Sequence, residues 1–284
     1  MTSQEKLQKC YQILQAKLKI LNIDFKPEIA LILGTGLGKL ADEIAIKATL
    51  NYSDIDGCPI STVDSHNGRF VFGYIQNVPV VIMQGRVHYY EGYAMQDVVI
   101  PTRLMKLMGA KVLFITNSVG ACNVDDFDAG DLMLITDHIS SFVPSPLIGA
   151  NFDNFGVRFP DMGEVYNLQL RQIVANTAKE LNINLKQGVY LQVSGPQFET
   201  PSEVKMYRNL GADVLGMSSV CEAMVAHHAG MKIVGVSFIS NVEKKGMDAT
   251  LEEIIEAADK NYAKFQKLIA TSITNIDKQK SLFE

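Results

Sequence analysis

The sequence has no tryptophan, and its 284 residues include only four cysteines and five histidines. The cysteines are scattered and none forms a CxxC pair, which argues against a disulfide framework or a zinc site. Reduced thiols fit a cytosolic protein better. The N-terminal MTSQEKLQKC lacks the apolar core and the cleavage site of a signal peptide. The sequence therefore predicts a cytoplasmic location.

Long apolar runs and basic clusters are missing as well. No apolar stretch approaches the roughly 18 residues of a membrane-spanning helix, so we expect no membrane partner. The net charge is -5 and no basic run stands out, which argues against nucleic acid as a partner. An acidic protein can still bind an anion, because local donors are enough to form an anion site.

Short apolar runs alternate with helical patterns along most of the chain. Strands are expected at 28–33, 70–75, 78–84, 111–116, 131–137, 189–194, 212–217 and 232–240. Helices are expected near 7–21, 94–108, 166–182, 201–209, 219–229 and 250–274. This alternation predicts an α/β fold with a largely parallel central sheet. No linker or repeat interrupts the chain, so residues 1–284 are expected to form a single domain. Pro79 could place its strand at an edge of the sheet.

Polar segments follow several of the expected strands, and ligands of open α/β sheets collect at the carboxyl ends of strands. The loop GTGLG (34–38) follows the strand 28–33. Its glycines would let backbone amides approach an anion, and Thr35 adds a hydroxyl. A simple tight turn is the alternative. The loop lacks a third glycine at the spacing of a dinucleotide-binding motif, which argues against a dehydrogenase.

The segment QGRVHYYEGY (84–93) places charged and aromatic groups behind an apolar strand. The planar guanidinium of Arg86 matches the geometry of phosphate oxygens, and His88 and Tyr90 lie beside it in the sequence. The alternative is a structural ion pair between Arg86 and Glu91.

Three further polar residues follow strands, and each has a second interpretation. Glu199 could accept a hydrogen bond from a purine N–H, or it could be a solvated acid before a helix. Ser218 could bind an anion at a helix N-terminus, or it could be an ordinary N-cap. Asn241 could donate to and accept from a base, or it could be a turn residue.

The histidines differ in what their surroundings predict. His138, His227 and His228 lie in apolar segments and are expected to be structural. His66 lies in STVDSHNGR, a loop that could move over a site; a plain surface histidine is the alternative.

Together these segments resemble the trimeric purine nucleoside phosphorylases. The matching stretches are LGTGLG, STVDSHNGRFVFG, MQGRVHYYEGY, TNSVGA, FGVRFPDM, VSGPQFET, GMSSVCEAMVAHHAGM and SFISN. They occur in the family's order from about residue 29 to 275, and the ordered set is highly specific. The resemblance implies a single-domain α/β fold whose mixed central sheet is partly closed into a barrel and surrounded by helices. It also implies a homotrimer with each active site near a subunit boundary.

The resemblance implies roles for individual residues. Phosphate would be held by Thr35, His66, Arg86, His88, Ser118 through its backbone N–H, and Ser218. The nucleoside would be contacted by Tyr90, Phe198, Glu199, Met217, Asn241 and, from a neighbouring subunit, Phe159. Asn241, Glu199 and His88 are the expected catalytic residues. The long segment 138–165, which contains three prolines, would carry Phe159 to the neighbour.

The implied reaction is the phosphorolysis of inosine or guanosine. Phosphate itself attacks the sugar, so inversion is expected and neither a metal nor an organic cofactor is required. A hydrogen bond from Asn241 to the purine would stabilise the negative charge that develops on the leaving base.

Three residues depart from the family pattern. Ser118 stands where many members have Ala, Val242 where some have Lys, and Leu251 where a His often contacts the ribose 5′-hydroxyl. The apolar Leu251 would suit a methylthioadenosine phosphorylase, but Asn241 stands where those enzymes have Asp. A non-catalytic nucleoside- or anion-binding protein is the alternative of another class, and Arg86 and Glu199 argue against it.

Overall fold

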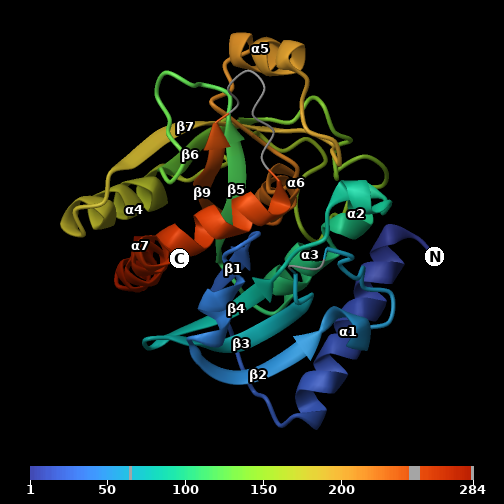
Figure 1. The fold of residues 1–284 in the computed structure, drawn as a ribbon. Coiled ribbons are helices and arrows are strands. Elements are labelled where there is room, and N and C mark those ends of the chain that lie inside the picture. Colours follow the sequence, from blue (N-terminus) through green and yellow to red (C-terminus); the bar gives the residue numbers. More distant parts are fainter. Residues whose placement is uncertain (64–65, 243–249, 283–284) are drawn as a thin grey trace.

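The computed structural model describes residues 1–63, 66–242 and 250–282. Within these ranges, nine strands form one sheet in the order β2-β3-β4-β1-β5-β8-β7-β6-β9 (Figure 1). The strands are β1 (Ile29–Leu33), β2 (Ala45–Asn51), β3 (Arg69–Ile75), β4 (Val78–Gln84), β5 (Val112–Ala121), β6 (Leu132–Ile139), β7 (Leu185–Gln192), β8 (Val214–Gly216) and β9 (Lys232–Val242).

The sheet closes on itself at one end. β5 pairs with β1, β8 and β9, so β5, β8, β7, β6 and β9 form a closed ring, while β2, β3, β4 and β1 extend from it as an open sheet. The mixed sheet partly closed into a barrel is therefore confirmed. The expectation of a largely parallel sheet is only partly right, because β2–β3, β3–β4, β5–β8 and β6–β9 are antiparallel pairs.

Helices cover both faces of the sheet. They are α1 (Ser3–Ile20), α2 (Met95–Val98), α3 (Ile100–Leu107), α4 (Leu168–Glu180), α5 (Pro201–Asn209), α6 (Val220–His228) and α7 (Leu251–Asp277). Leu14 of α1, Leu104 of α3 and Ala223 of α6 belong to one core cluster. Ile173 of α4 and Leu268 of α7 belong to a second cluster. Helices therefore pack against both faces of the sheet, which buries most of its strands.

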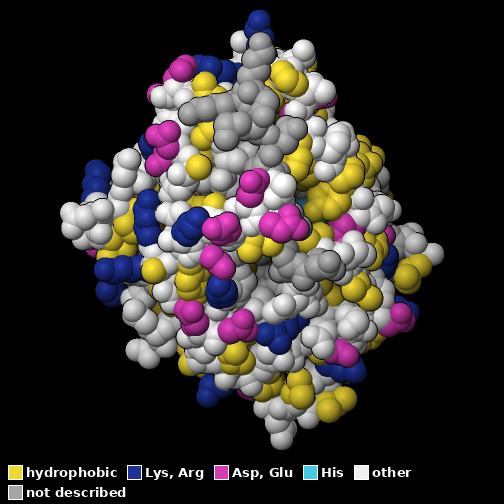
Figure 2. Space-filling model, in the orientation of Figure 1, with side chains coloured by type: hydrophobic (Ala, Val, Ile, Leu, Met, Phe, Trp, Pro, Cys, Tyr) yellow, Lys and Arg dark blue, Asp and Glu magenta, His cyan; other side chains and the backbone are white. Residues whose placement is uncertain are grey.

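The surface over α7 is charged but mixed in sign. In Figure 2, Lys and Arg side chains alternate with Asp and Glu side chains on this face. Two of the ion pairs there are Lys39–Asp259 and Lys260–Glu256, with nitrogen–oxygen distances of 2.7 and 2.8 Å. Among the described residues, no helix is long and apolar enough to span a membrane.

Several expectations for single elements are corrected. The expected helix 7–21 begins earlier, at Ser3, and ends at Ile20; Leu21 follows its last residue and is 48% exposed. The expected helix 94–108 is split into α2 and α3, with Pro101 in the first turn of α3, because proline cannot donate the backbone hydrogen bond of a helix interior. The edge position predicted from Pro79 is wrong, since β4 lies between β3 and β1.

Two differences bear on the site. β2 was not expected; it is mostly exposed, so it lacks the apolar run that marks the other strands. β5 and β9 continue past their expected ends, to Ala121 and Val242. Ser118 and Asn241 therefore lie on strands of the barrel, and Asn241 is not a turn residue.

Candidate active site

A cavity of about 400 Å³ gathers most of the predicted site residues. It contains every one of them except His66 and Phe159: its lining includes Thr35, Arg86, His88, Tyr90, Ser118, Phe198, Glu199, Met217, Ser218 and Asn241. These residues come from the loops after β1, β4 and β7, from β5 and β9, and from the turn between β8 and α6. A more open groove of about 440 Å³ beside α1 contains none of them.

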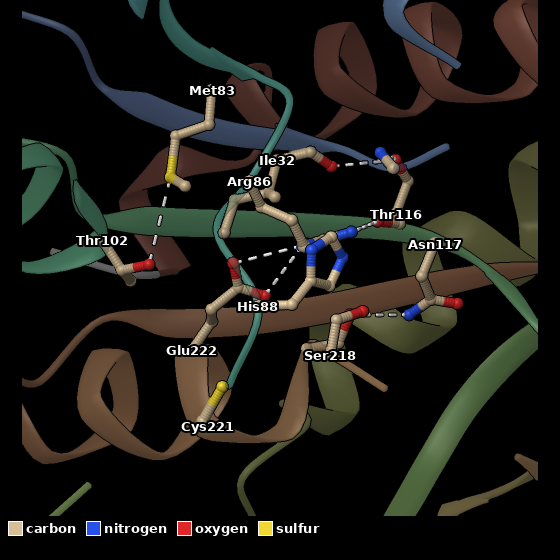
Figure 3. A network of polar contacts seen from close by, with 12 residues as sticks. Ile32, Met83, Arg86, His88, Thr102, Thr116, Asn117, Ser218, Cys221 and Glu222 are labelled. Atoms are coloured by element: carbon tan, nitrogen blue, oxygen red, sulfur yellow. Dashed lines mark hydrogen bonds and ion pairs between the residues drawn. The ribbon is translucent and has the colours of Figure 1, made fainter. Parts of the chain in front are cut away.

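Arg86 is the most deeply buried charged group of the cavity, with 1% of its surface exposed. Its Nε donates to both carboxylate oxygens of Glu222, at 3.2 and 3.1 Å, and its Nη1 donates to the carbonyl of Thr116 at 2.9 Å (Figure 3). Its Nη2 is buried and has no hydrogen-bond partner among the described residues. An unpaired buried donor is costly, so this nitrogen fits a site that receives an anion.

The alternative ion pair between Arg86 and Glu91 is wrong, because the partner of Arg86 is Glu222. Sequence reasoning missed Glu222. The signal that was available is an acidic residue within the apolar helix VCEAMVAHH, where a carboxylate requires a buried partner.

Glu91 instead holds His88. One Glu91 oxygen accepts from the backbone N–H of His88 at 2.7 Å and lies 3.1 Å from His88 Nδ1. Burial raises the pKa of Glu91, but hydrogen bonds from His88 and Thr62 outweigh it and lower this pKa to about 2. Burial also lowers the pKa of His88. A neutral His88 that donates from Nδ1 to Glu91 leaves Nε2 as an acceptor.

Three rings form a stack along this wall. The ring of His88 lies 4.7 Å from that of Tyr90 and 5.2 Å from that of His66. Burial raises the pKa of Tyr90 to about 12, so its hydroxyl stays protonated and can donate.

His66 lies next to the main cavity without lining it. Its Nδ1 is 2.8 Å from the carbonyl of Arg86, and its Nε2 is 3.4 Å from the Thr35 hydroxyl. It lines a neighbouring cavity of about 230 Å³ instead. Burial is the main cause that lowers the pKa of His66 to about 3. His66 is 9% exposed, so the interpretation as a plain surface histidine is wrong.

The loop after β1 is fixed by backbone geometry and by β5. Gly36 has φ +75°, and a Cβ there would lie 2.5 Å from that of Ala258. Glycine is thus required both for the conformation and for the close approach. The Ser118 hydroxyl donates to the carbonyl of Thr35 at 2.8 Å, so it supports this loop.

The turn into α6 is strained. Ser219, the N-cap residue, has φ +77° although it is not glycine, a conformation that persists only when the surroundings enforce it. Asn117 Nδ2 donates to its hydroxyl at 2.9 Å. Ser218 is therefore not the N-cap residue; it lines the cavity one position earlier, with its hydroxyl 3.2 Å from that of Ser219.

Phe198, Glu199, Met217 and Asn241 also line the cavity. The Ser240 hydroxyl donates to Asn241 Oδ1 at 2.9 Å, which orients the amide. Glu199 precedes Thr200, the N-cap residue of α5, and the carboxylate that completes this cap belongs to Glu203. Glu199 therefore stands directly before a helix, as one of the two interpretations predicts, and it also lines the cavity.

Phe159 does not reach the cavity of its own chain. It is 88% exposed, in the loop between β6 and α4 that also exposes Phe142, Ile148 and Val157. Its ring lies 5.6 Å from the guanidinium carbon of Arg158.

The remaining histidines are structural, as expected. His227 and His228 face backbone carbonyls at 2.8 and 3.1 Å, and His138 lies 3.3 Å from the Tyr166 hydroxyl. Within the described ranges, no group of three or more His, Cys, Asp or Glu side chains could hold a metal ion. Leu251 begins α7, but its side chain lies outside the described residues.

Comparisons with known proteins agree with this arrangement. Residues 28–274 match the family model of the phosphorylase superfamily. The chain is 46% identical over 258 residues to purine nucleoside phosphorylase 1 of Bacillus subtilis, covering 90% of this chain and 95% of that one. It is 39% identical over 273 residues to the Bos taurus purine nucleoside phosphorylase, covering 92% and 93%.

Solved structures show the same fold. Schistosoma mansoni purine nucleoside phosphorylase in complex with adenosine superposes with a TM-score of 0.87 at 34% identity, covering 95% of this chain and 96% of that chain. The same enzyme in complex with inosine gives a TM-score of 0.86. The chain is therefore an enzyme of the phosphorylase superfamily and belongs to its purine nucleoside phosphorylases.

Proposed function

We propose that the protein cleaves 6-oxopurine ribonucleosides and 2′-deoxyribonucleosides, inosine and guanosine above all, with inorganic phosphate. The products are the free purine and ribose or deoxyribose 1-phosphate. The observation that carries this proposal is a single cavity that joins a buried guanidinium with an unpartnered Nη2 to an oriented amide and a carboxylate. One end suits phosphate and the other suits a purine.

At the phosphate end, donors from separate elements converge. Arg86 Nη2 and the hydroxyls of Thr35 and Ser218 donate to phosphate oxygens, and the backbone N–H of Ser118 adds a fourth donor. Nε2 of neutral His88 accepts a hydrogen bond from a protonated phosphate oxygen. His66, in contact with Thr35, completes this end when phosphate binds. Fixed donors of this kind orient the phosphate for attack at little reorganisation cost.

At the base end, the charge that develops on the leaving purine is stabilised. Asn241 donates to the purine N7 and reaches O6, while Glu199 accepts from the purine N1–H. Phe198 stacks beside base and sugar, and Tyr90 and Met217 contact the ribose hydroxyls. The bond to N7 strengthens as negative charge reaches the base, so it lowers the barrier rather than only binding the substrate.

The reaction requires no reactant other than the nucleoside and phosphate. A phosphate oxygen forms a bond to C1′ as the bond from C1′ to the purine nitrogen breaks, and the electron pair leaves with the base. One displacement inverts the configuration at C1′. Phosphate is the co-substrate, and the reaction needs neither a metal nor an organic cofactor.

We also propose a cytoplasmic homotrimer with a role in purine salvage. The four cysteines are buried free thiols, which suits a reducing compartment. The exposed Phe159 and its apolar neighbours support an interface through which one subunit completes the site of the next. Light scattering that finds a fully active monomer would contradict this assembly.

The decisive assay measures the cleavage of inosine, guanosine, adenosine and methylthioadenosine with and without phosphate. We expect phosphate-dependent cleavage of the first two and much slower cleavage of the others. Preferred cleavage of methylthioadenosine would instead favour a methylthioadenosine phosphorylase. Purine binding without turnover would favour a non-catalytic binding protein. Proton NMR of the sugar phosphate tests inversion, because retention would require a covalent intermediate.

A further inference from the structure

Glu222 is a buried carboxylate that the mechanism above does not use. It is the third residue of α6, it is 1% exposed, and it does not line the cavity. Its two oxygens lie 3.2 and 3.1 Å from Arg86 Nε. A charged side chain buried this fully is unfavourable unless it is paired, so Glu222 and Arg86 depend on each other.

The pairing uses only one side of the guanidinium. Arg86 has three nitrogens that donate: Nε is taken by Glu222 and Nη1 by the Thr116 carbonyl of β5. Gly34 packs against the same group, since a Cβ there would lie 3.1 Å from Nη1. Contacts on these two nitrogens (Figure 3) fix the plane of the guanidinium and leave Nη2 without a partner among the described residues.

The start of α6 is itself anchored to the barrel. The Cys221 N–H donates to Gln192 Oε1 of β7 at 3.0 Å, and the Ser219 hydroxyl accepts from Asn117 of β5. Ser218, at the cavity, lies directly before this segment. One anchored helix start therefore places both the Ser218 hydroxyl and the carboxylate that orients Arg86.

We propose, on the basis of the phosphorolytic function proposed above, that Glu222 is a positioning residue for phosphate. It holds Arg86 through Nε, so that Nη2 meets the attacking phosphate at a fixed angle. The length of the Glu222 side chain matters more than its charge in this role. A shorter carboxylate cannot reach Nε from the anchored helix, whereas an amide of the same length can still accept from it.

The test separates length from charge. Glu222→Asp keeps the charge and shortens the side chain, Glu222→Gln keeps the length without the charge, and Glu222→Ala removes both. We expect the phosphate KM to rise by about tenfold or more in the Asp and Ala variants and by less than about threefold in the Gln variant, because small misplacements of a binding group have large kinetic effects. The nucleoside KM should stay within about twofold of the wild type.

KM does not depend on the fraction of enzyme that is folded, so partial unfolding does not obscure the result. Glu180→Gln, at an exposed position at the end of α4, is the matched control and should leave both KM values unchanged. A phosphate KM that stays near the wild-type value in the Asp and Ala variants would overturn the proposal. Equal rises in both KM values would overturn it too, because they would indicate a general structural role.

Phosphorolysis and the positioning role of Glu222 can be tested separately. A wild type without phosphate-dependent cleavage would contradict phosphorolysis itself. In that case the rise in Tm on adding phosphate still reports on the anion site. Loss of this rise in the Asp variant and its retention in the Gln variant would support the positioning role; equal rises in wild type, Asp and Gln variants would reject it.

Discussion

The part of the cavity that we propose for phosphate (the phosphate end) and the part that we propose for the purine (the base end) are built differently. At the phosphate end Arg86 is 1% and Ser218 9% exposed; the Thr116 carbonyl of β5 and Glu222 of α6 hold Arg86, and Asn117 of β5 holds Ser219, the residue after Ser218. At the base end Phe198 is 45% exposed, and Glu199 lies on a connecting segment between β7 and α5. A small, charged reactant requires fixed donors in a dry environment, whereas a planar base can be recognised by a few groups at a more open rim.

Mutations at the two ends should therefore have different effects. Changes at the phosphate end should affect turnover and folding together, because the groups that we propose to bind the anion are also buried structural partners. Changes at the base end should affect substrate choice with little effect on stability.

Arg86→Ala should give the largest effect. We expect kcat/KM for phosphate to fall by about 10²- to 10³-fold, the usual loss for a fixed donor in an active site. The variant should also lose about 3–5 kcal/mol of unfolding free energy, because Glu222 is left buried and unpaired. Steady-state kinetics and urea unfolding measure both effects.

A double variant separates the two effects of Arg86. Arg86→Met combined with Glu222→Leu should recover most of the stability without recovering activity, since apolar pairs often replace buried ion pairs at little cost. Arg208→Ala, at an exposed ion pair, is the control. Wild-type phosphate kinetics in Arg86→Ala would remove Arg86 from the phosphate site.

Asn241 tests the base end. Asn241→Ala should lower kcat by about 10²-fold, because the lost hydrogen bond strengthens in the transition state. Asn241→Asp should shift preference toward adenosine, since a carboxylate accepts from a 6-amino group. The measurement is kcat/KM for inosine and adenosine in the three proteins, with the exposed Asn176→Ala as control. If the Asp variant shows no relative shift, Asn241 does not determine specificity.

The buried His66 should make the phosphate end sensitive to acid. Its pKa is lowered to about 3 in the folded protein, against about 6.5 in an unfolded chain. At a pH between these two pKa values, the unfolded state therefore binds one proton more at His66 than the folded state does. Stability from this source is complete above about pH 6.5 and falls by up to about 1.4 kcal/mol per pH unit as the pH drops.

Urea unfolding of wild type and His66→Asn at pH 7, 6 and 5 checks this slope. The variant should have the shallower pH dependence, and His227→Gln should match the wild type. Parallel pH profiles of wild type and His66→Asn would show that His66 is not a neutral buried group.

Phe159 should give the smallest effect. Phe159→Ala should raise the nucleoside KM by up to about tenfold, the contribution of a stacked aromatic side chain. The phosphate KM should not change, because Phe159 belongs to the base end of a neighbouring site in the proposed trimer. Ile20→Ala, at another exposed apolar residue, is the control. An altered phosphate KM would contradict the division of the cavity into two ends.

The agreement between sequence and structure varied with the kind of signal. Strands such as β1 and β4 were predicted well, because their apolar runs are long enough to require burial. The exposed β2 gave no such signal. The apolar runs of β5 and β9 end before the strands do, because Ser118 and Asn241, which interrupt them, line the cavity. Ser118 and Asn241 were therefore expected after strands and lie within them.

The sequence by itself determined the α/β class, the family and the set of groups that line the cavity, since these depend on residue types in a fixed order. Only the tertiary structure decided how those groups are paired. Arg86 is separated from Glu222 by 136 positions, and no local pattern distinguishes this partner from the nearby Glu91. Arg86 pairs with Glu222 because closure of the barrel places the start of α6 against the loop after β4. His66 and Phe159, which the sequence grouped with the cavity, do not line it in a single chain: His66 lines a neighbouring cavity and Phe159 is exposed, and no local pattern predicts either placement.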